Sequence, residues 1–301
     1  MAARMIEICY CIDRNAEACG FVSLHSLLRR VSEKTSVMIC YDREENIPGA
    51  DWGRRLSSFG FDFELRHQGI DNSIFKKCRS TFGSYAAYLL LGAADHAATE
   101  KLLCLDADCI FTDDIKCLYH TDLEGKDVGL LSYGDCSMRD PNETKILKTH
   151  GKTASNLYYG TQVVLFDTEK HRQSRRLERY QRIATGDPFL LMLWDQTVIN
   201  CAFVDDEVKD LKPAFGEWNQ QAPRDGSAPV FAPGMIHYAG TPKPWDLFGE
   251  FFHPCHQQWR EAAAAAGLRG VALKNYISRT AIKRALNARN QYAVWFKKPS
   301  P

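Results

Sequence analysis

The sequence contains no uninterrupted run of 18 apolar residues, and it does not open with a charged leader followed by an apolar stretch and a small-residue cleavage site. A run of about that length is needed to span a bilayer, and such a leader directs export. We therefore expect a cytoplasmic protein. With 301 residues, 45% of them hydrophobic and 25% charged, the chain is long enough to bury a sizeable core.

The 11 cysteines contain no Cys-x-x-Cys pair, and they show neither the spacing of zinc ligands nor that of a small disulfide framework. Several, such as Cys9 and Cys104, lie inside apolar runs, where a thiol behaves as a small hydrophobic group. This usage indicates a reducing compartment and gives no support for a catalytic cysteine.

Glycine-rich phosphate loops are also missing, since neither Gly-x-Gly-x-x-Gly nor a Walker sequence occurs. If a nucleotide binds, its phosphates are held in another way.

Acidic residues are absent from residues 267–301, which carry eight Lys and Arg. The formal net charge of +1 therefore leaves 1 − 8 = −7 for residues 1–266. We expect one domain over residues 1–266 and a separate basic tail over residues 267–301.

Strands and helices alternate in the expected secondary structure. Apolar runs predict strands at 5–12, 36–41, 61–65, 102–105, 127–133 and 158–167, and apolar residues at helical spacing predict helices at 21–31, 52–59, 84–98, 169–183 and 188–202. This order begins as a βαβ unit and predicts an α/β fold.

Two carboxylates, Asp106 and Asp108, directly follow the most apolar of these strands. Such a strand is typical of the interior of a parallel sheet, and ligands bind at the carboxyl ends of strands in open α/β sheets. Residues two apart in an extended segment point the same way, so both carboxylates can face one divalent ion. A turn or a helix N-cap is the competing interpretation, and it suits the neighbouring Asp113 and Asp114 better.

A second polar motif follows the apolar pair 235–236 and contains His237, Gly240 and Lys243. A single histidine after apolar residues is usually a hydrogen-bonded core residue. Here, however, a glycine that permits close backbone approach and a lysine that offers a compact positive charge follow it closely. This combination suits a diphosphate and its metal ion, which imidazole can ligate.

Four segments together resemble glycosyltransferase family 8, the retaining family that includes bacterial lipopolysaccharide galactosyl- and glucosyltransferases and glycogenin. They are residues 8–15, 103–108, 194–196 and 237–245. The resemblance implies a GT-A fold over residues 1–266, a Rossmann-like αβα sandwich with a mixed, mostly parallel sheet. It also implies a UDP-sugar donor and Mn²⁺ or Mg²⁺ as the metal.

The resemblance assigns roles by position to the two motifs. Asp106, Asp108 and His237 would ligate the metal ion, and Gly240 and Lys243 would hold the oxygens of the diphosphate.

Further donor contacts are implied elsewhere in the chain. Asp13 and Asn15 would face the uridine, Asp195 and Gln196 would lie beside the transferred sugar, and Asp135 would bind a sugar hydroxyl.

The chain departs from the family pattern at two places that touch the sugar. Ala87 stands where many members have an arginine, with Lys76, Lys77 and Arg79 nearby, and 160–162 reads Gly-Thr-Gln instead of Asn-Ala-Gly.

The implied reaction is metal-dependent transfer of galactose or glucose, with retention, to a cell-surface glycan acceptor such as lipopolysaccharide core. The metal would act as a Lewis acid on the UDP leaving group, with electrostatic help from Lys243. Asp195 or Gln196 would be nearest for attack from the far face, whereas a same-face route needs neither. A nucleotidyltransferase, and a nucleotide-sugar-binding protein with weak or no transferase activity, remain as alternatives.

The basic tail carries apolar residues at steps of three or four from Leu273 to Trp295. A basic amphipathic helix of this kind suits an anionic membrane surface, which would place the protein at the inner face of the membrane beside a lipid-linked acceptor. A helix docked on the domain is the alternative. No aromatic-basic motif supports binding of nucleic acid.

Overall fold

The computed structural model describes residues 5–80, 83–222, 232–240, 243–246, 253 and 255–268, and every structural statement below concerns these residues. The amphipathic helix expected from Leu273 onward lies outside them. Within this part of the chain, no helix is long and apolar enough to cross a membrane.

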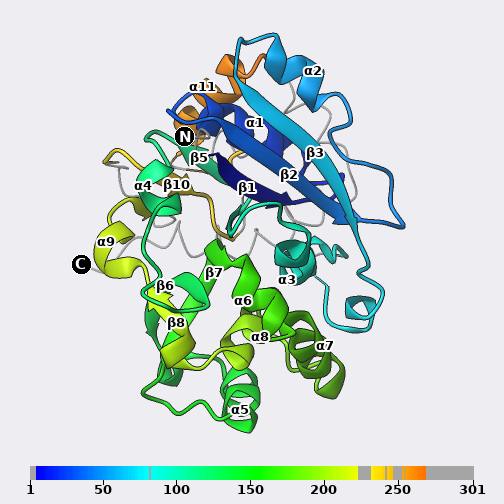
Figure 1. Cartoon of the computed structure of the whole chain (residues 1–301), viewed down its shortest axis with the longest axis vertical. Helices are drawn as coiled ribbons and strands as arrows, with labels where there is room; N and C mark the ends of the chain where they lie inside the picture. The colour runs from blue at the N-terminus through cyan, green and yellow to red at the C-terminus, as the bar shows by residue number, and fades with distance from the viewer. Residues whose placement is uncertain are drawn as a thin grey trace, which may run out of the picture.

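A seven-stranded sheet forms the centre of the molecule, in the order β3-β2-β1-β4-β7-β6-β8 (Figure 1). Its strands are β1 (Ile6–Cys11), β2 (Thr35–Asp42), β3 (Phe63–Ile70), β4 (Lys101–Leu105), β6 (Val128–Asp135), β7 (Leu157–Asp167) and β8 (Val208–Asp210). Only β7 runs antiparallel to its neighbours, β4 and β6, while the other pairs are parallel. This arrangement confirms the expected mixed, mostly parallel sheet. It also places the carboxyl ends of β1, β4 and β6 on the same side of the sheet, where these strands finish.

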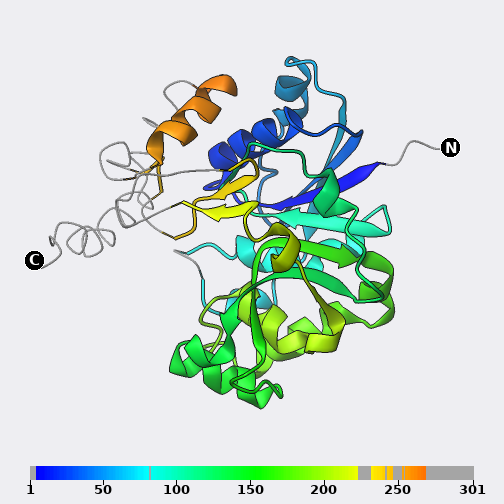
Figure 2. The same cartoon turned by 90° about the vertical axis from the view of Figure 1, so that its left-hand side faces the viewer.

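Helices cover both faces of the sheet, as the two views show (Figures 1 and 2). One face packs against α1 (Glu17–Leu28), α2 (Trp52–Ser57), α4 (Lys116–Tyr119), α9 (Lys212–Phe215) and α11 (His256–Ala265). The other packs against α3 (Leu90–Ala93), α5 (Pro141–Thr149), α6 (Thr168–Gln173), α7 (Arg176–Gly186) and α8 (Asp195–Ala202). The result is an αβα sandwich with one hydrophobic core on each face.

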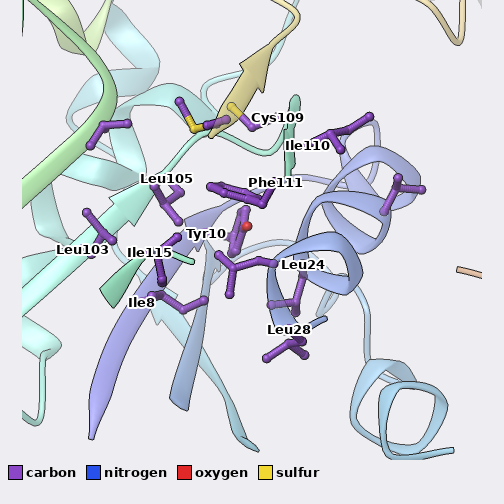
Figure 3. Close-up of a cluster of buried hydrophobic side chains, with 14 of the residues drawn as sticks. Ile8, Tyr10, Leu24, Leu28, Leu103, Leu105, Cys109, Ile110, Phe111 and Ile115 are labelled. Carbon is purple, nitrogen blue, oxygen red and sulfur yellow. The ribbon is translucent and has the colours of Figure 1, made fainter. Parts of the chain in front are cut away.

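Alternate residues of the central strands build the core beneath α1 (Figure 3). Ile8 and Tyr10 of β1 and Leu103 of β4 face Leu24 and other apolar residues of that helix, and all four are fully buried. Side chains two apart on a strand share a face, so the residues between them belong to the other core. Burial on both faces explains why these strands are continuous apolar runs in the sequence.

A second, three-stranded sheet forms where two distant segments meet, in the order β5-β10-β9. It consists of β5 (Cys109–Phe111), β9 (Asn219–Gln221) and β10 (Met235–His237). β10 runs antiparallel to β5, with His237 opposite Cys109, and parallel to β9, with His237 opposite Gln221. This small sheet therefore carries His237 to the end of β4.

Three predicted helices are broken in the structure. The segment expected as one helix over 84–98 consists of 3-10 turns at Ala86–Leu89 and Ala94–His96 with the short α3 between them, packed against β1 and β2. The helix expected over 188–202 begins only at Asp195. The residue before it, Trp194, has a positive φ of 53°, which is uncommon for a residue other than glycine and incompatible with an α-helix. Likewise, Arg175 with φ of 48° separates α6 from α7.

Candidate active site

Asp106, Asp108, His237 and Lys243 converge at the carboxyl end of β4. His237 Nε2 lies 3.5 Å from Asp106 Oδ2 and 3.2 Å from Asp108 Oδ1. The Lys243 ammonium forms an ion pair with the other oxygen of Asp108 and donates to the Tyr238 carbonyl at 2.5 Å. Four residues separated by up to 137 positions in the chain, from 106 to 243, thus form one charged cluster, as the two sequence motifs predict.

The two carboxylates of the cluster differ in their electrostatic environment. Desolvation and the neighbouring Asp108 charge raise the pKa of Asp106 above its usual range. Because the Asp106 side chain is 47% exposed, we regard repulsion by Asp108 as the stronger cause. Burial alone raises the pKa of Asp108, but the Lys243 ammonium and His237 outweigh it and hold that pKa below its usual range.

The donor set fits a divalent cation. Asp108 Oδ1 is buried and has no hydrogen-bond partner within the described part of the chain, although His237 Nε2 is close by. Burying a charged carboxylate oxygen without a hydrogen-bond partner costs free energy unless a cation or a ligand binds to that oxygen. Two carboxylates and one imidazole are suitable ligands for Mn²⁺ or Mg²⁺.

Lys243 is held by the loop that follows β10. The backbone N–H of Lys243 donates to Asp246 Oδ2 at 2.9 Å, and its ammonium lies 5.8 Å from the centre of the Trp245 ring. Trp245 is buried between Tyr238 and Trp259 of α11, with ring centres 6.1 and 5.3 Å away. The hydrogen bond to Asp246 and the buried Trp245 ring therefore fix the backbone that carries the lysine, and its ammonium pairs with Asp108.

A group of polar side chains behind His237 was not predicted from the sequence. The Tyr133 hydroxyl accepts hydrogen bonds from Gln221 Nε2 at 2.9 Å and Asn219 Nδ2 at 3.1 Å, and Gln162 Nε2 also donates to it. The Gln221 amide lies 3.1 Å from His237 Nδ1, which turns Nε2 toward the carboxylates. Tyr133 precedes Asp135 by two residues on β6, which is the only local signal for this role.

Replacing Gln221 by alanine is expected to weaken Mn²⁺-dependent nucleotide binding by about 10- to 100-fold, because partners that orient a ligating histidine have effects of this size. Calorimetric titration of Mn²⁺ in the presence of UDP measures the change. Gln173→Ala, the same substitution at an exposed position on α6, should leave the affinity unaltered. Equal affinities of wild type and Gln221→Ala would show that His237 needs no such support.

Asp195 opens α8 and is 7% exposed. Burial raises its pKa to about 7, although a hydrogen bond with the Thr161 side chain and bonds from backbone N–H groups of α8 favour the charged form. Thr161 precedes Gln162, whose carbonyl accepts the Asp106 N–H at 3.1 Å, so β7 connects Asp195 to the metal-ligand candidates. Gln196, the next residue, forms a side-chain hydrogen bond with Tyr158.

The remaining predicted site residues lie at the same edge or on nearby loops. Asp13 follows β1, and its carboxylate accepts the backbone N–H groups of Asn15 at 2.8 Å and Ala16 at 3.0 Å. Asp135 ends β6 and accepts the Ser137 N–H at 2.9 Å. Gly240 is exposed, and its φ of 73° suits a glycine. Their proposed contacts with the donor stay predictions.

The structure explains one of the two departures from the family pattern. A side chain at Gly160 would collide with the Tyr133 ring and with Gln162, so the glycine makes room for the polar group behind His237. Ala87 lies in the 3-10 turn Ala86–Leu89. Among the basic residues near it in sequence, Lys76 is paired with Asp42 at 2.9 Å and with Glu44.

Comparison with known proteins decides the family. Residues 7–248 match the family model of glycosyl transferase family 8. The chain belongs to this family. The match contains every site residue discussed above, including the four of the charged cluster.

Two curated glycosyltransferase sequences are similar to this chain at low identity. The chain is 22% identical over 192 residues to glycosyltransferase GlyF of Streptococcus pneumoniae serotype 4, covering 61% of this chain and 44% of GlyF. It is 24% identical over 206 residues to probable galacturonosyltransferase-like 4 of Arabidopsis thaliana, covering 58% and 54%. The chain thus spans about half the length of these curated relatives.

Solved structures share the fold. The galactosyltransferase LgtC, in complex with donor and acceptor sugar analogues, superposes with a TM-score of 0.71 at 19% identity, covering 86% of this chain and 96% of LgtC. The bifunctional glycosyltransferase WbbM gives a TM-score of 0.69 at 17% identity, covering 92% of this chain and 52% of WbbM. These likenesses establish the GT-A fold of this family 8 chain.

Proposed function

We propose that this family 8 chain is a retaining hexosyltransferase that uses a UDP-sugar and a divalent metal ion. The observation that carries the proposal is the convergence of Asp106, Asp108, His237 and Lys243 at the carboxyl end of β4. Acidic and imidazole ligands beside a lysine suit a metal-bound diphosphate. A hydrolase acting through two carboxylates would instead place them on either side of a sugar ring.

Asp106, Asp108 and His237 would hold the metal ion, either Mn²⁺ or Mg²⁺. When bound, the ion would supply Lewis-acid stabilisation of the negative charge on a UDP leaving group. His237 Nε2 lies 3.2 Å from Asp108 Oδ1, and Lys243 and His237 hold the pKa of Asp108 below its usual range, so its carboxylate is charged at neutral pH. Lys243 would offer a second positive charge to the diphosphate.

Asp195 and Gln196 are proposed to bind the transferred sugar. Asp195 is buried at the beginning of α8, where backbone N–H groups and Thr161 orient its carboxyl group. Gln196 is held through Tyr158, whose hydroxyl donates to Glu143 at 2.6 Å on α5. Fixed in this way, the pair can position hydroxyl groups of a hexose and support charge that develops at its anomeric carbon.

The donor is proposed to be UDP-galactose or UDP-glucose, and the acceptor a glycan such as lipopolysaccharide core. The solved complex of LgtC with donor and acceptor sugar analogues supports a two-sugar reaction on this fold. Cytoplasmic location, and membrane binding through residues 267–301, stay predictions.

Isothermal calorimetry of UDP with and without Mn²⁺ tests the proposal, followed by a transfer assay with both UDP-sugars. We expect UDP to bind clearly only when Mn²⁺ is present, and transfer from one donor with retained configuration. UDP binding without turnover on any simple sugar acceptor would favour the nucleotide-sugar-binding protein instead. Absence of binding under every metal condition would contradict both.

A further inference from the structure

Three cysteine thiols meet on the face of the main sheet that packs against α3 and α8. Cys9 and Cys11 lie two residues apart on β1, and Cys40 is the register partner of Cys11 on β2. Cys9 Sγ lies 3.5 Å from Cys40 Sγ and 3.9 Å from Cys11 Sγ, and the three sulfur atoms all lie within 4.8 Å of one another. We call this group the thiol cluster.

A fourth thiol borders the thiol cluster. Cys104 is the register partner of Cys9 on β4, and its side chain is hydrogen-bonded with that of Cys9. Four cysteines from three adjacent strands therefore share one face of the sheet. None of them takes part in the proposed transfer reaction, and all are free thiols.

The sulfur spacing suits a bound metal ion. Two thiolates on one zinc ion lie about 3.8 Å apart when each Zn–S bond is about 2.3 Å and the geometry is tetrahedral. The separations of 3.5 and 3.9 Å in the thiol cluster bracket this value. Thiolates select soft ions such as Zn²⁺ and Cu⁺ over the hard ions that carboxylates prefer.

The members of the thiol cluster differ in burial. Cys9 and Cys40 are fully buried, whereas Cys11, the last residue of β1, is only partly buried. Cys11 is therefore the member of the thiol cluster nearest to solvent, and the one through which an ion would enter. Burial among apolar neighbours disfavours free thiolates, so each thiol that ligates the ion would release its proton to water as the metal–sulfur bond forms.

We propose that Cys9, Cys11 and Cys40 form a binding site for one soft metal ion, with Cys104 next to it, separate from the carboxylate site at Asp106 and Asp108. Bound metal would join the carboxyl-terminal halves of β1 and β2. This site differs in chemistry from the donor site, and it does not depend on the proposed function.

Titration with Cd²⁺, a soft ion whose thiolate complexes absorb in the ultraviolet, tests the proposal on the full chain after chelation under reducing conditions. We expect one equivalent to produce the thiolate charge-transfer band, and Zn²⁺, whose thiolate complexes absorb at shorter wavelength, to remove it by competition. Cys40→Ala should lose the band. A band of unchanged intensity in Cys40→Ala, or no band in wild type, would overturn the proposal.

Cys109→Ala is the matched control, because Cys109 is a buried thiol close to Asp108 and His237. It should keep the band, and loss of the band in this variant would place the ion at the donor site instead. A second measurement needs no variant. Bound Cd²⁺ should slow alkylation of the partly buried Cys11 in wild type but not that of the exposed Cys117, and equal rates at Cys11 with and without the ion would refute the site.

Discussion

Asp108→Asn is expected to abolish the Mn²⁺-dependent part of UDP binding and to lower sugar transfer by about 100-fold or more. Asp108 is the residue that contacts both His237 and Lys243. Its removal takes away one proposed metal ligand and leaves the lysine without its ion-pair partner in a largely buried position. Losses of this size accompany removal of a single group that stabilises developing charge.

Calorimetry with UDP and a transfer assay measure both effects. Asp113→Asn is the matched control, because Asp113 is exposed and its carboxylate accepts the N–H of the neighbouring Asp114. Thermal unfolding distinguishes a lost ligand from a damaged fold: a single cooperative transition is expected, because the lost repulsion with Asp106 offsets part of the cost of leaving Lys243 unpaired. Full transfer activity in Asp108→Asn would contradict the assignment of the site.

Asp195→Asn is expected to make the protein more stable at neutral and alkaline pH while transfer falls by about 100-fold. The side chain is 7% exposed, and burial raises its pKa to about 7, above the value of about 3.9 in an unfolded chain. Folding therefore favours the protonated form. The stability of wild type relative to Asp195→Asn is highest below pH of about 4 and declines until pH of about 7, above which the difference is constant.

The full difference corresponds to about 4 kcal/mol, from about three pKa units at about 1.4 kcal/mol each. Urea unfolding at pH 5 and pH 8 measures it, and the advantage of Asp195→Asn should be larger at pH 8. Asp206→Asn, at an exposed aspartate, should not show this pH dependence. If Asp195→Asn were no more stable at either pH, the carboxylate would have to be better solvated than its burial indicates.

The parts of the site that the sequence predicted are those encoded by contiguous motifs. The strand ending at Leu105 is apolar because it is buried on both faces, and two carboxylates directly after such a strand must lie at the edge of the sheet. The motif that begins at His237 contains Gly240 and Lys243 within the next six residues, so these three residues are close in space whatever the rest of the fold. The convergence of Asp106, Asp108, His237 and Lys243 was therefore predictable, and the family match confirms the resemblance.

Features set by long-range contacts could not be predicted locally. β9 is the polar triplet Asn219–Gln221, and it is a strand only because β10 pairs with it. For this reason, nothing in the sequence near Gln221 predicted that its side chain contacts His237. The helix expected to begin at 188 begins at Asp195 because Trp194 adopts a backbone conformation that local spacing does not reveal. Strain of about 1–3 kcal/mol at such residues is offset by the surrounding tertiary structure.

The pairing of β10 with β5 affects the order in which the residues of the site come together as the chain is synthesised. During synthesis from the N-terminus, β1, β4 and the two aspartates emerge more than 120 residues before His237, as their positions 106, 108 and 237 show. A nascent chain can thus complete most of its main sheet while it still lacks the proposed ligand from β10. Synthesis must therefore pass His237 before all three proposed metal ligands are present, so binding of a cation at this site would be a late event in folding.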